Sequence, residues 1–196
     1  MAAVRKIALF GGTFDPVHRG HLHLARAAVD ELGLDEVRFL PCRISPHKQD
    51  SAPTPVADRL EMLRLATAGL PWAVVDDCEA KRDGPSYSYQ TAEAMAARFP
   101  QARLFWIMGG DQWAVLDQWA ESQRLAACVE FIVFTRDGAG DLAPRAGYRL
   151  HPLHTSHPAS STVIREALAT GATHHEWLAE NVAAYLTSRC LYQAAQ

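Results

Sequence analysis

Two histidines near the N-terminus, His18 and His21, stand three residues apart in the stretch GGTFDPVHRGH, which spans residues 11–21. A short apolar segment precedes this stretch, and residues at helical spacing follow it. Glycines let a backbone approach a ligand closely, and the free N–H groups and dipole of a helix start attract an anion. Both imidazoles can project to one side of the helix entrance and donate to phosphate oxygens. The pattern therefore predicts a phosphate-binding site.

Such a site suits the transfer of a phosphate-containing group. A phosphate monoester acceptor is already ionised near neutral pH, so transfer requires positioning and charge stabilisation more than a strong general base. Two histidines without a neighbouring nucleophile meet this requirement. The alternatives are a metal cluster that includes His23, or ordinary polar loop residues. The absence of Cys or carboxylate partners at recognisable zinc spacing favours phosphate.

The elements that must position this site alternate between strands and helices. Short apolar runs indicate strands at 6–10, 37–40, 73–75, 104–108, 130–134 and 148–153. Apolar residues at helical spacing indicate helices at 22–32 with Gly33 as the C-cap, around 60–66 and ending near Gly69, and at 90–99, 113–127, 161–169 and 176–191. This alternation predicts an α/β fold with a doubly wound, mostly parallel sheet and helices on both faces.

Ligands of such sheets bind beyond the carboxyl ends of the strands, where the strand order reverses. With the order 3-2-1-4-5-6, this point lies between the first and fourth strands. We therefore expect residues 11–21 and 109–111 to face each other across one crevice.

Length and composition limit the domain organisation and the partners. The chain has 196 residues, 48% of them hydrophobic, which predicts a single domain of residues 1–196 with a C-terminal helical segment at about 160–196. Lys and Arg total 19 against 22 Asp and Glu. This balance argues against nucleic-acid and membrane partners, so a phosphate site must be locally basic.

The compartment is predicted from the cysteines and the N-terminus. The four cysteines are widely spaced and form no C-x-x-C pair, and the first apolar run is too short for a signal-peptide core or a membrane span. Both observations favour a cytoplasmic protein with reduced thiols. The sequence leaves the oligomeric state open, a homo-oligomer included.

The stretch GGTFDPVHRGH closely resembles the N-terminal signature of the His-x-Gly-His nucleotidyltransferase superfamily, especially that of nicotinate-nucleotide adenylyltransferases. Further motifs of this family follow in order along the chain: Pro46-His47-Lys48, Ser86-Tyr87-Ser88, Gly109-Gly110-Asp111, Trp119 and Ser160-Ser161-Thr162-Val163-Ile164-Arg165. The resemblance implies a Rossmann-like nucleotidyltransferase fold. It also implies an enzyme of NAD biosynthesis that joins ATP and nicotinate mononucleotide into nicotinate adenine dinucleotide and pyrophosphate, with Mg²⁺ bound together with ATP.

The resemblance also assigns roles to single residues. The catalytic residues that hold the triphosphate and the acceptor phosphate would be His18, His21, Lys48 and Arg165. The ATP site would comprise Gly11, Gly12, Thr13, Phe14, His18, His21, Gly109, Asp111, Arg136, Ser161, Thr162 and Arg165. The acceptor site would comprise Asp15, Lys48, Ser86, Tyr87, Ser88 and Trp119.

Elementary chemistry is consistent with these roles and also allows plainer ones. Ser161 and Thr162 can open a helix whose hydroxyls and N–H groups meet phosphates, or they can form an ordinary helix cap. Trp119 can stack on a pyridine ring or belong to the core. Lys48 can be an exposed loop lysine, and Arg136 a surface arginine.

Two departures from the family pattern are small. Ala159 stands where Ile often precedes Ser-Ser-Thr, and Ser88 stands where Thr is usual. In the family, the Ser-Tyr-Thr stretch binds the nicotinate carboxylate largely through its backbone, so we expect serine at position 88 to be tolerated.

Several rival functions share parts of this pattern. Pantetheine-phosphate enzymes usually carry Thr where His18 stands and generally lack the Ser86–Ser88 and Trp119 motifs. Nicotinamide-nucleotide and cytidylyl-transferring relatives share the histidine site and differ in substrate preference. A non-catalytic nucleotide sensor would be expected to have lost a phosphate-site residue, whereas all four predicted catalytic residues are present. The acidic balance and the absence of a basic run disfavour a nucleic-acid-binding module.

Overall fold

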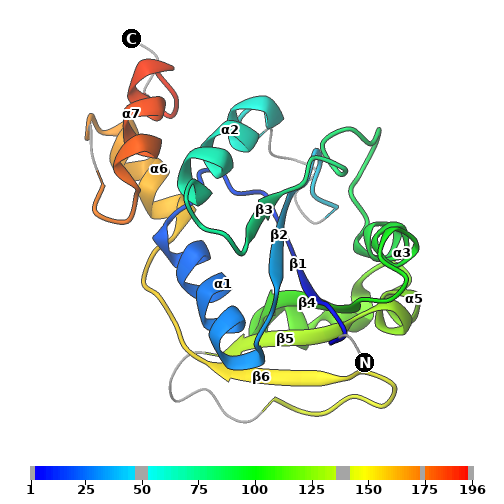
Figure 1. Cartoon of the computed structure of the whole chain (residues 1–196). Helices are drawn as coiled ribbons and strands as arrows, with labels where there is room; N and C mark the ends of the chain where they lie inside the picture. The colour runs from blue at the N-terminus through cyan, green and yellow to red at the C-terminus, as the bar shows by residue number, and fades with distance from the viewer. Residues whose placement is uncertain (1–2, 47–52, 136–141, 173–174, 194–196) are drawn as a thin grey trace.

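A computed structural model describes residues 3–46, 53–135, 142–172 and 175–193 of the chain (Figure 1). The described strands form one parallel sheet in the order β3-β2-β1-β4-β5-β6. The strands are β1 (Lys6–Gly12), β2 (Glu36–Pro41), β3 (Ala73–Val75), β4 (Arg103–Gly109), β5 (Glu130–Thr135) and β6 (Leu150–His154). This confirms the predicted doubly wound sheet and places the reversal of strand order between β1 and β4.

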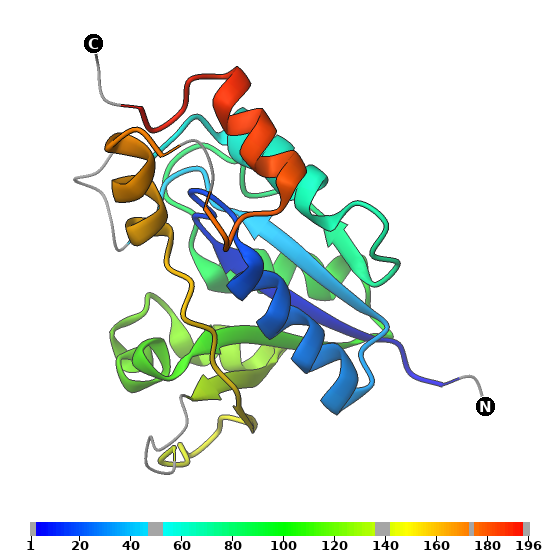
Figure 2. The ribbon, with the colours of Figure 1, turned by 90° about the vertical axis from the view of Figure 1, so that its left-hand side faces the viewer.

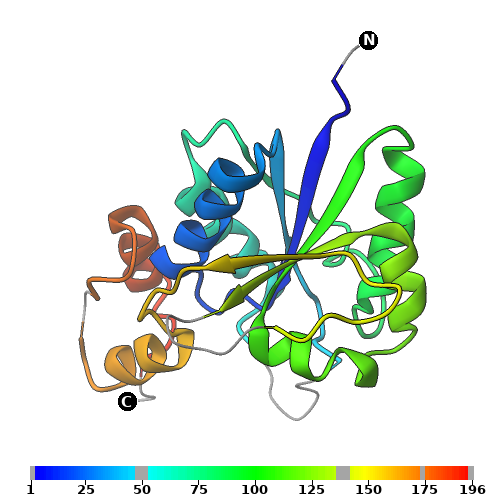
Figure 3. The same cartoon turned by 90° about the horizontal axis from the view of Figure 1, so that it is seen from below.

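Helices cover both faces of the sheet, as predicted. They are α1 (Arg19–Leu32), α2 (Val56–Thr67), α3 (Ser88–Arg98), α4 (Gly110–Ala114), α5 (Ser122–Cys128), α6 (Ser161–Ala169) and α7 (Glu180–Ser188), together with the 3-10 turn η1 (Leu116–Gln118). Figure 3 shows the sheet between α1 on one side and α3 with α5 on the other. The predicted C-cap at Gly33 is confirmed, because its φ of 58° lies in the left-handed region.

Alternate residues of the strands supply two separate cores. Ala8 and Phe10 of β1 belong to the core beneath α1, whereas Ile7 and Leu9 belong to the core beneath α3 and α5. All four side chains are buried, and the other parallel strands next to β1 are largely buried too. Burial on both faces holds the carboxyl ends of β1 and β4 in a fixed relation.

The helix predicted over residues 113–127 is wrong as a single element. The chain instead forms α4, η1 and α5, with Glu121 at a φ of 53° before α5 begins. Leu116 and Leu125 pack in the same core. Nine residues of a straight helix would turn the second about 180° away from the first. The segment must therefore break for both leucines to be buried.

The last helix begins later than predicted, at Glu180 rather than near residue 176. In this helix, the hydroxyl of Tyr185 donates to the carboxylate of Asp58 in α2 at 2.7 Å. Arg189, just after the helix, forms an ion pair with the same carboxylate at 3.3 Å. Figure 2 shows α7 lying alongside α2.

The predicted division into a single domain with a C-terminal helical segment stays a prediction. Within the described ranges, no helix is long and apolar enough to cross a membrane.

Candidate active site

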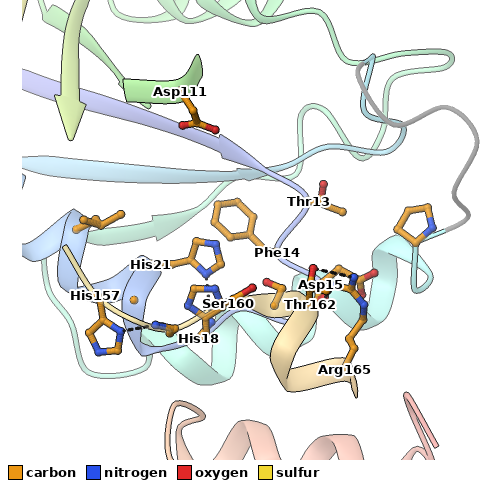
Figure 4. A pocket seen from close by; sticks show the side chains of 15 residues that line it. Thr13, Phe14, Asp15, His18, His21, Asp111, His157, Ser160, Thr162 and Arg165 are labelled. Carbon is orange, nitrogen blue, oxygen red and sulfur yellow. Dashed lines mark hydrogen bonds between the residues drawn. The ribbon is translucent and has the colours of Figure 1, made fainter. Parts of the chain in front are cut away.

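A cavity of about 620 Å³ opens at the carboxyl ends of β1 and β4 (Figure 4). Its wall combines the loop after β1, the start of α1, the start of α6 and one residue of α4. The lining residues are Thr13, Phe14, Asp15, His18, Gly20, His21, Leu24, Pro53, Asp111, His157, Ala159, Ser160, Ser161, Thr162 and Arg165. The predicted meeting of residues 11–21 and 109–111 is confirmed at Asp111, which shares this wall with both histidines.

The two histidines form one stacked unit. Their ring centroids lie 3.7 Å apart with an interplanar angle of 26°. The backbone N–H of His18 donates to Nδ1 of His21 at 3.2 Å. A neutral imidazole that accepts at Nδ1 carries its proton on Nε2, so His21 has a donor available for a ligand. The edge of the Phe14 ring packs against His21 at a centroid distance of 5.0 Å.

Burial keeps this unit uncharged. It lowers the pKa of His18 to about 4, with a further contribution from the nearby His157. Burial also lowers the pKa of His21 well below its usual value, and His18 adds to that effect. Bound phosphate would oppose both shifts, because an adjacent anion favours the charged imidazole. Nδ1 of His18 is buried and has no hydrogen-bond partner within the described part of the chain.

A close approach explains the glycine between the two histidines. A Cβ at Gly20 would lie 3.0 Å from Nδ1 of His18 and 3.2 Å from Cβ of Ala159. Both contacts are tighter than ordinary van der Waals distance. The small residue lets the loop that carries Ala159 pack directly over the start of α1.

The start of α6 is tied to the loop after β1. Ser161 donates through Oγ to the carbonyl of Pro16 at 3.0 Å. Nη1 of Arg165 donates to the carbonyl of Asp15 at 2.7 Å, while its Nη2 lies 3.4 Å from the hydroxyl of Thr162. These bonds bring the helix start, with its free N–H groups, to the same cavity as the histidines.

Asp15 lines the cavity, but both of its carboxylate oxygens already have partners. One accepts from the hydroxyl of Tyr192, and the other accepts from the backbone N–H of Thr54 at 3.2 Å. The residue therefore joins the C-terminal segment to the loop after β1, which supports positioning more than direct contact with the acceptor.

A second cavity of about 290 Å³ lies on the other side of Thr13, which lines both cavities. It contains three of the predicted acceptor-site residues, namely Ser86, Ser88 and Trp119. Ser86 is fixed by its N–H to the carbonyl of Ile44 at 3.0 Å. Ser88 is the first residue of α3, and the preceding Tyr87 makes no side-chain cap. The helix start therefore presents N–H groups to a ligand.

A third cavity of about 590 Å³ adjoins the first beyond Asp111. Gly109, Gly110 and Asp111 line it together with the carboxyl end of β5 and the loop after β6. A Cβ at Gly109 would lie 2.5 Å from Oδ1 of Asp111, so glycine is needed for the carboxylate to fold back over the strand end. The three cavities form a path along the carboxyl edge of the sheet.

The remaining predicted site residues are placed less centrally. Gly11 and Gly12 line the smaller cavity rather than the one with the histidines. Tyr87 lines none of these three cavities. Lys48 and Arg136 lie outside the described residues, so their predicted roles stay predictions.

Sequence reasoning missed several residues that the fold brings to this region. His157 lines the first cavity and Glu79 lines the second. Ser160, which stands in the family motif but was given no site role, also lines the first cavity. His157 precedes Ser160 by three residues and follows a predicted strand, a signal that could have indicated a site position. Tyr192 lies 177 residues from Asp15, and no local pattern indicates their contact.

Comparisons with known proteins identify the family of this chain. The cytidylyltransferase-like family matches residues 9–167. A probable nicotinate-nucleotide adenylyltransferase of Gloeobacter violaceus is 39% identical over 95% of this chain and 96% of its own length. One from Neisseria meningitidis serogroup B is 38% identical over 97% of this chain and 100% of its own. The chain belongs to the nicotinate-nucleotide adenylyltransferase family.

The fold of this adenylyltransferase is shared with distant solved structures. Nicotinic acid mononucleotide adenylyltransferase of Plasmodium falciparum, solved in complex with NaAD, superposes with a TM-score of 0.76. The match covers 96% of this chain and 97% of that one at 16% identity. Such low identity supports the shared fold alone, which is the predicted Rossmann-like nucleotidyltransferase fold.

Proposed function

We propose that this protein joins ATP and nicotinate mononucleotide to give nicotinate adenine dinucleotide and pyrophosphate. The observation that carries the proposal is the shared wall at Thr13. On one side lies the cavity with the stacked histidines, and on the other lies the cavity with Trp119 and the start of α3. A mononucleotide with its pyridine ring in the second cavity can extend its phosphate into the first.

The reaction needs no covalent enzyme intermediate. A phosphate oxygen of nicotinate mononucleotide attacks the α-phosphorus of ATP in line, and the bond from that phosphorus to the β-phosphate bridging oxygen breaks. Pyrophosphate leaves with the electron pair of that bond. His18 and His21 donate hydrogen bonds to phosphate oxygens as charge builds on them. Because both imidazoles are neutral in the free protein, their charged forms are favoured only when phosphate is bound.

The start of α6 would complete the phosphate site. Thr162 and Arg165 line the cavity, and the first N–H groups of α6 have no side-chain cap, so a phosphate can accept from them. Asp111 is exposed at the junction with the third cavity, where its carboxylate can accept from nucleoside hydroxyls. These positions support adenosine in the third cavity and the triphosphate in the first.

The second cavity has the chemistry to bind a flat ring with an acidic substituent. Trp119 can stack on a cationic pyridine ring. The positive end of α3 favours a carboxylate on that ring over a neutral amide. Glu79 also lines this cavity, and its negative charge would repel a ligand carboxylate. Burial raises the pKa of Glu79 to about 7, which favours its neutral form and weakens that repulsion. These features favour the nicotinate acceptor.

Magnesium is proposed to enter with ATP. The described residues contain no group of three or more His, Cys, Asp or Glu side chains that could hold a metal ion. Mg²⁺ is commonly held by one or two carboxylates plus substrate phosphates, and Asp111 is an exposed carboxylate in the cavity wall. This donor set fits an ion held mainly by the triphosphate, where it would neutralise charge on the leaving pyrophosphate.

Pyrophosphate release tests the proposal. The purified protein is given Mg²⁺-ATP with nicotinate mononucleotide, nicotinamide mononucleotide or phosphopantetheine, and a parallel series contains CTP in place of ATP. We expect rapid release only with ATP and the nicotinate acceptor. Preference for the amide would retain the reaction and replace the substrate. The absence of pyrophosphate release with every pair of nucleotide and acceptor would contradict an adenylyltransferase of this kind and favour a nucleotide sensor.

A further inference from the structure

His157 occupies a position that the predicted machinery leaves without a role. It lies in the loop between β6 and α6 and lines both the histidine cavity and the third cavity. Only Leu24 and Asp111 share that property among the lining residues of these two cavities. Figure 4 shows His157 beside His18, on the opposite side from Arg165. It therefore stands at the junction of the two cavities, where it can contact a ligand that extends through both.

The loop fixes one nitrogen of the ring. Nδ1 of His157 accepts from the backbone N–H of Ala159 at 3.1 Å. In the neutral imidazole the proton must then reside on Nε2, which makes that atom a hydrogen-bond donor. The bond to Ala159 also links the ring to the residue that packs over Gly20.

The surroundings of this ring suit an anion. The groups that face it from α1 and its cap are His18, Arg19 and His23, and the His23 ring centroid lies 5.6 Å away. Among the described residues that line these two cavities, Asp111 is the one carboxylate apart from Asp15, whose oxygens are already bonded. Burial lowers the pKa of His157, and charge on His23 and Arg19 adds to that effect. A bound polyanion would relieve this repulsion.

We propose that His157 is a third imidazole of the ATP site, which donates through Nε2 to ATP where the adenosine joins the triphosphate. This inference rests on the proposed function for the identity of the nucleotide. The residue would strengthen ATP binding and orient the α-phosphate, while the acceptor cavity would be unaffected. Its role is thus separable from that of the stacked pair, which lines only the histidine cavity.

Two substitutions separate contact from loop structure. His157→Asn keeps an acceptor near the position of Nδ1 and so can preserve the bond to Ala159, but it removes the Nε2 donor. His157→Gln places an amide donor near the position of Nε2. The control is His175→Asn, because His175 likewise accepts at Nδ1 from the N–H two residues later, at 3.3 Å, and lines none of the three cavities.

The measurements are ATP affinity by calorimetry without acceptor, and KM for each substrate. We expect H157N to weaken ATP binding by roughly tenfold, the size of one charge-assisted hydrogen bond, with KM for the acceptor and the unfolding midpoint unchanged. H157Q should recover most of the affinity, and H175N should match wild type.

Unchanged ATP affinity in H157N, or equal losses in H157N and H175N, would overturn the inference. If wild type binds ATP but transfers its adenylyl group to none of the acceptors, the proposed function fails. The comparison of ATP affinity between H157N and wild type still decides the role of His157. Failure of wild type to bind ATP would overturn both.

Discussion

At the amino edge of the sheet, charged residues stand at the start of neighbouring strands and pair with one another. Arg5 before β1 pairs with Glu36 of β2, and Glu130 of β5 pairs with Arg103 of β4 and Arg149 before β6. We call these five residues the paired edge. At the carboxyl edge, the stacked histidines, Thr162 and Asp111 face cavities instead. We call that set the open edge.

The difference separates stability from function along one sheet. In the paired edge, Glu130 is only 3% exposed and is stabilised as a carboxylate by hydrogen bonds from Arg103 and His151. The charge of this buried carboxylate is thus already balanced by groups of the chain itself. In the open edge, burial suppresses charge on His18 and His21 without supplying a counter-ion among the residues that the structure describes. A bound phosphate can supply this missing counter-ion and so favour the charged imidazoles.

The largest expected effect comes from the open edge. His18→Ala removes a preorganised donor to the phosphates and should lower kcat by about a hundredfold. The free energy of unfolding should change little or rise, because a buried nitrogen without a partner in the described chain is also removed. Turnover and urea unfolding measure the two effects. Near-full turnover of H18A would contradict the role of the stacked pair.

The paired edge should respond in the opposite way. Glu130→Gln breaks the bonds to Arg103 and His151 and should cost about 1–3 kcal/mol of unfolding free energy at pH 7, with kcat within about twofold of wild type. Arg103 hydrogen bonds, then His151, hold the pKa of Glu130 at about 2. Its stabilisation is therefore present above pH 4.5 and lost as pH falls toward 2. Urea unfolding against pH should show a steeper acid-side slope in wild type than in E130Q, and equal slopes would contradict the role of Glu130.

A backbone donor in the wall of the second cavity gives an intermediate effect. Ser88 is the first residue of α3, where proline fits the helix but lacks an N–H. Ser88→Pro should raise KM for nicotinate mononucleotide by about tenfold and leave KM for ATP unchanged. Ser88→Thr is the matched control and should behave like wild type. Equal acceptor affinity in S88P and S88T would show that this N–H does not bind the nicotinate carboxylate.

The smallest expected effect comes from a buried acid in the second cavity. Burial raises the pKa of Glu79 from 4.5 to about 7, so its protonated form suits the folded state. The stability that it contributes is full below pH 4.5 and is lost as pH rises through about 7. The free energy of unfolding of the Glu79→Gln variant, taken relative to that of wild type, should therefore be higher at pH 8 than at pH 5 by about 1–2 kcal/mol. Urea unfolding of both proteins at pH 5 and pH 8 measures this difference. A variant that is relatively more stable at pH 5 than at pH 8 would contradict the prediction.

Local pattern was sufficient to predict the strands and the histidine turn, because each depends on periodicity or on a short motif, whereas the strand order entered only as a condition. The break between α4 and α5 was not predictable, since it depends on where Leu116 and Leu125 find a common core. The position of His157 and the tie from Tyr192 to Asp15 were missed for the same reason. Both depend on contacts between segments far apart in sequence.

The most direct test of the account is a crystal structure with nicotinate adenine dinucleotide bound. We predict the pyridine ring at Trp119, the linking phosphates beside His18 and Thr162, and the adenosine in the cavity beyond Asp111. The product would then follow the carboxyl edge of the sheet from the second cavity through the first to the third. A dinucleotide bound in the reverse direction, or away from the stacked histidines, would contradict the central claim.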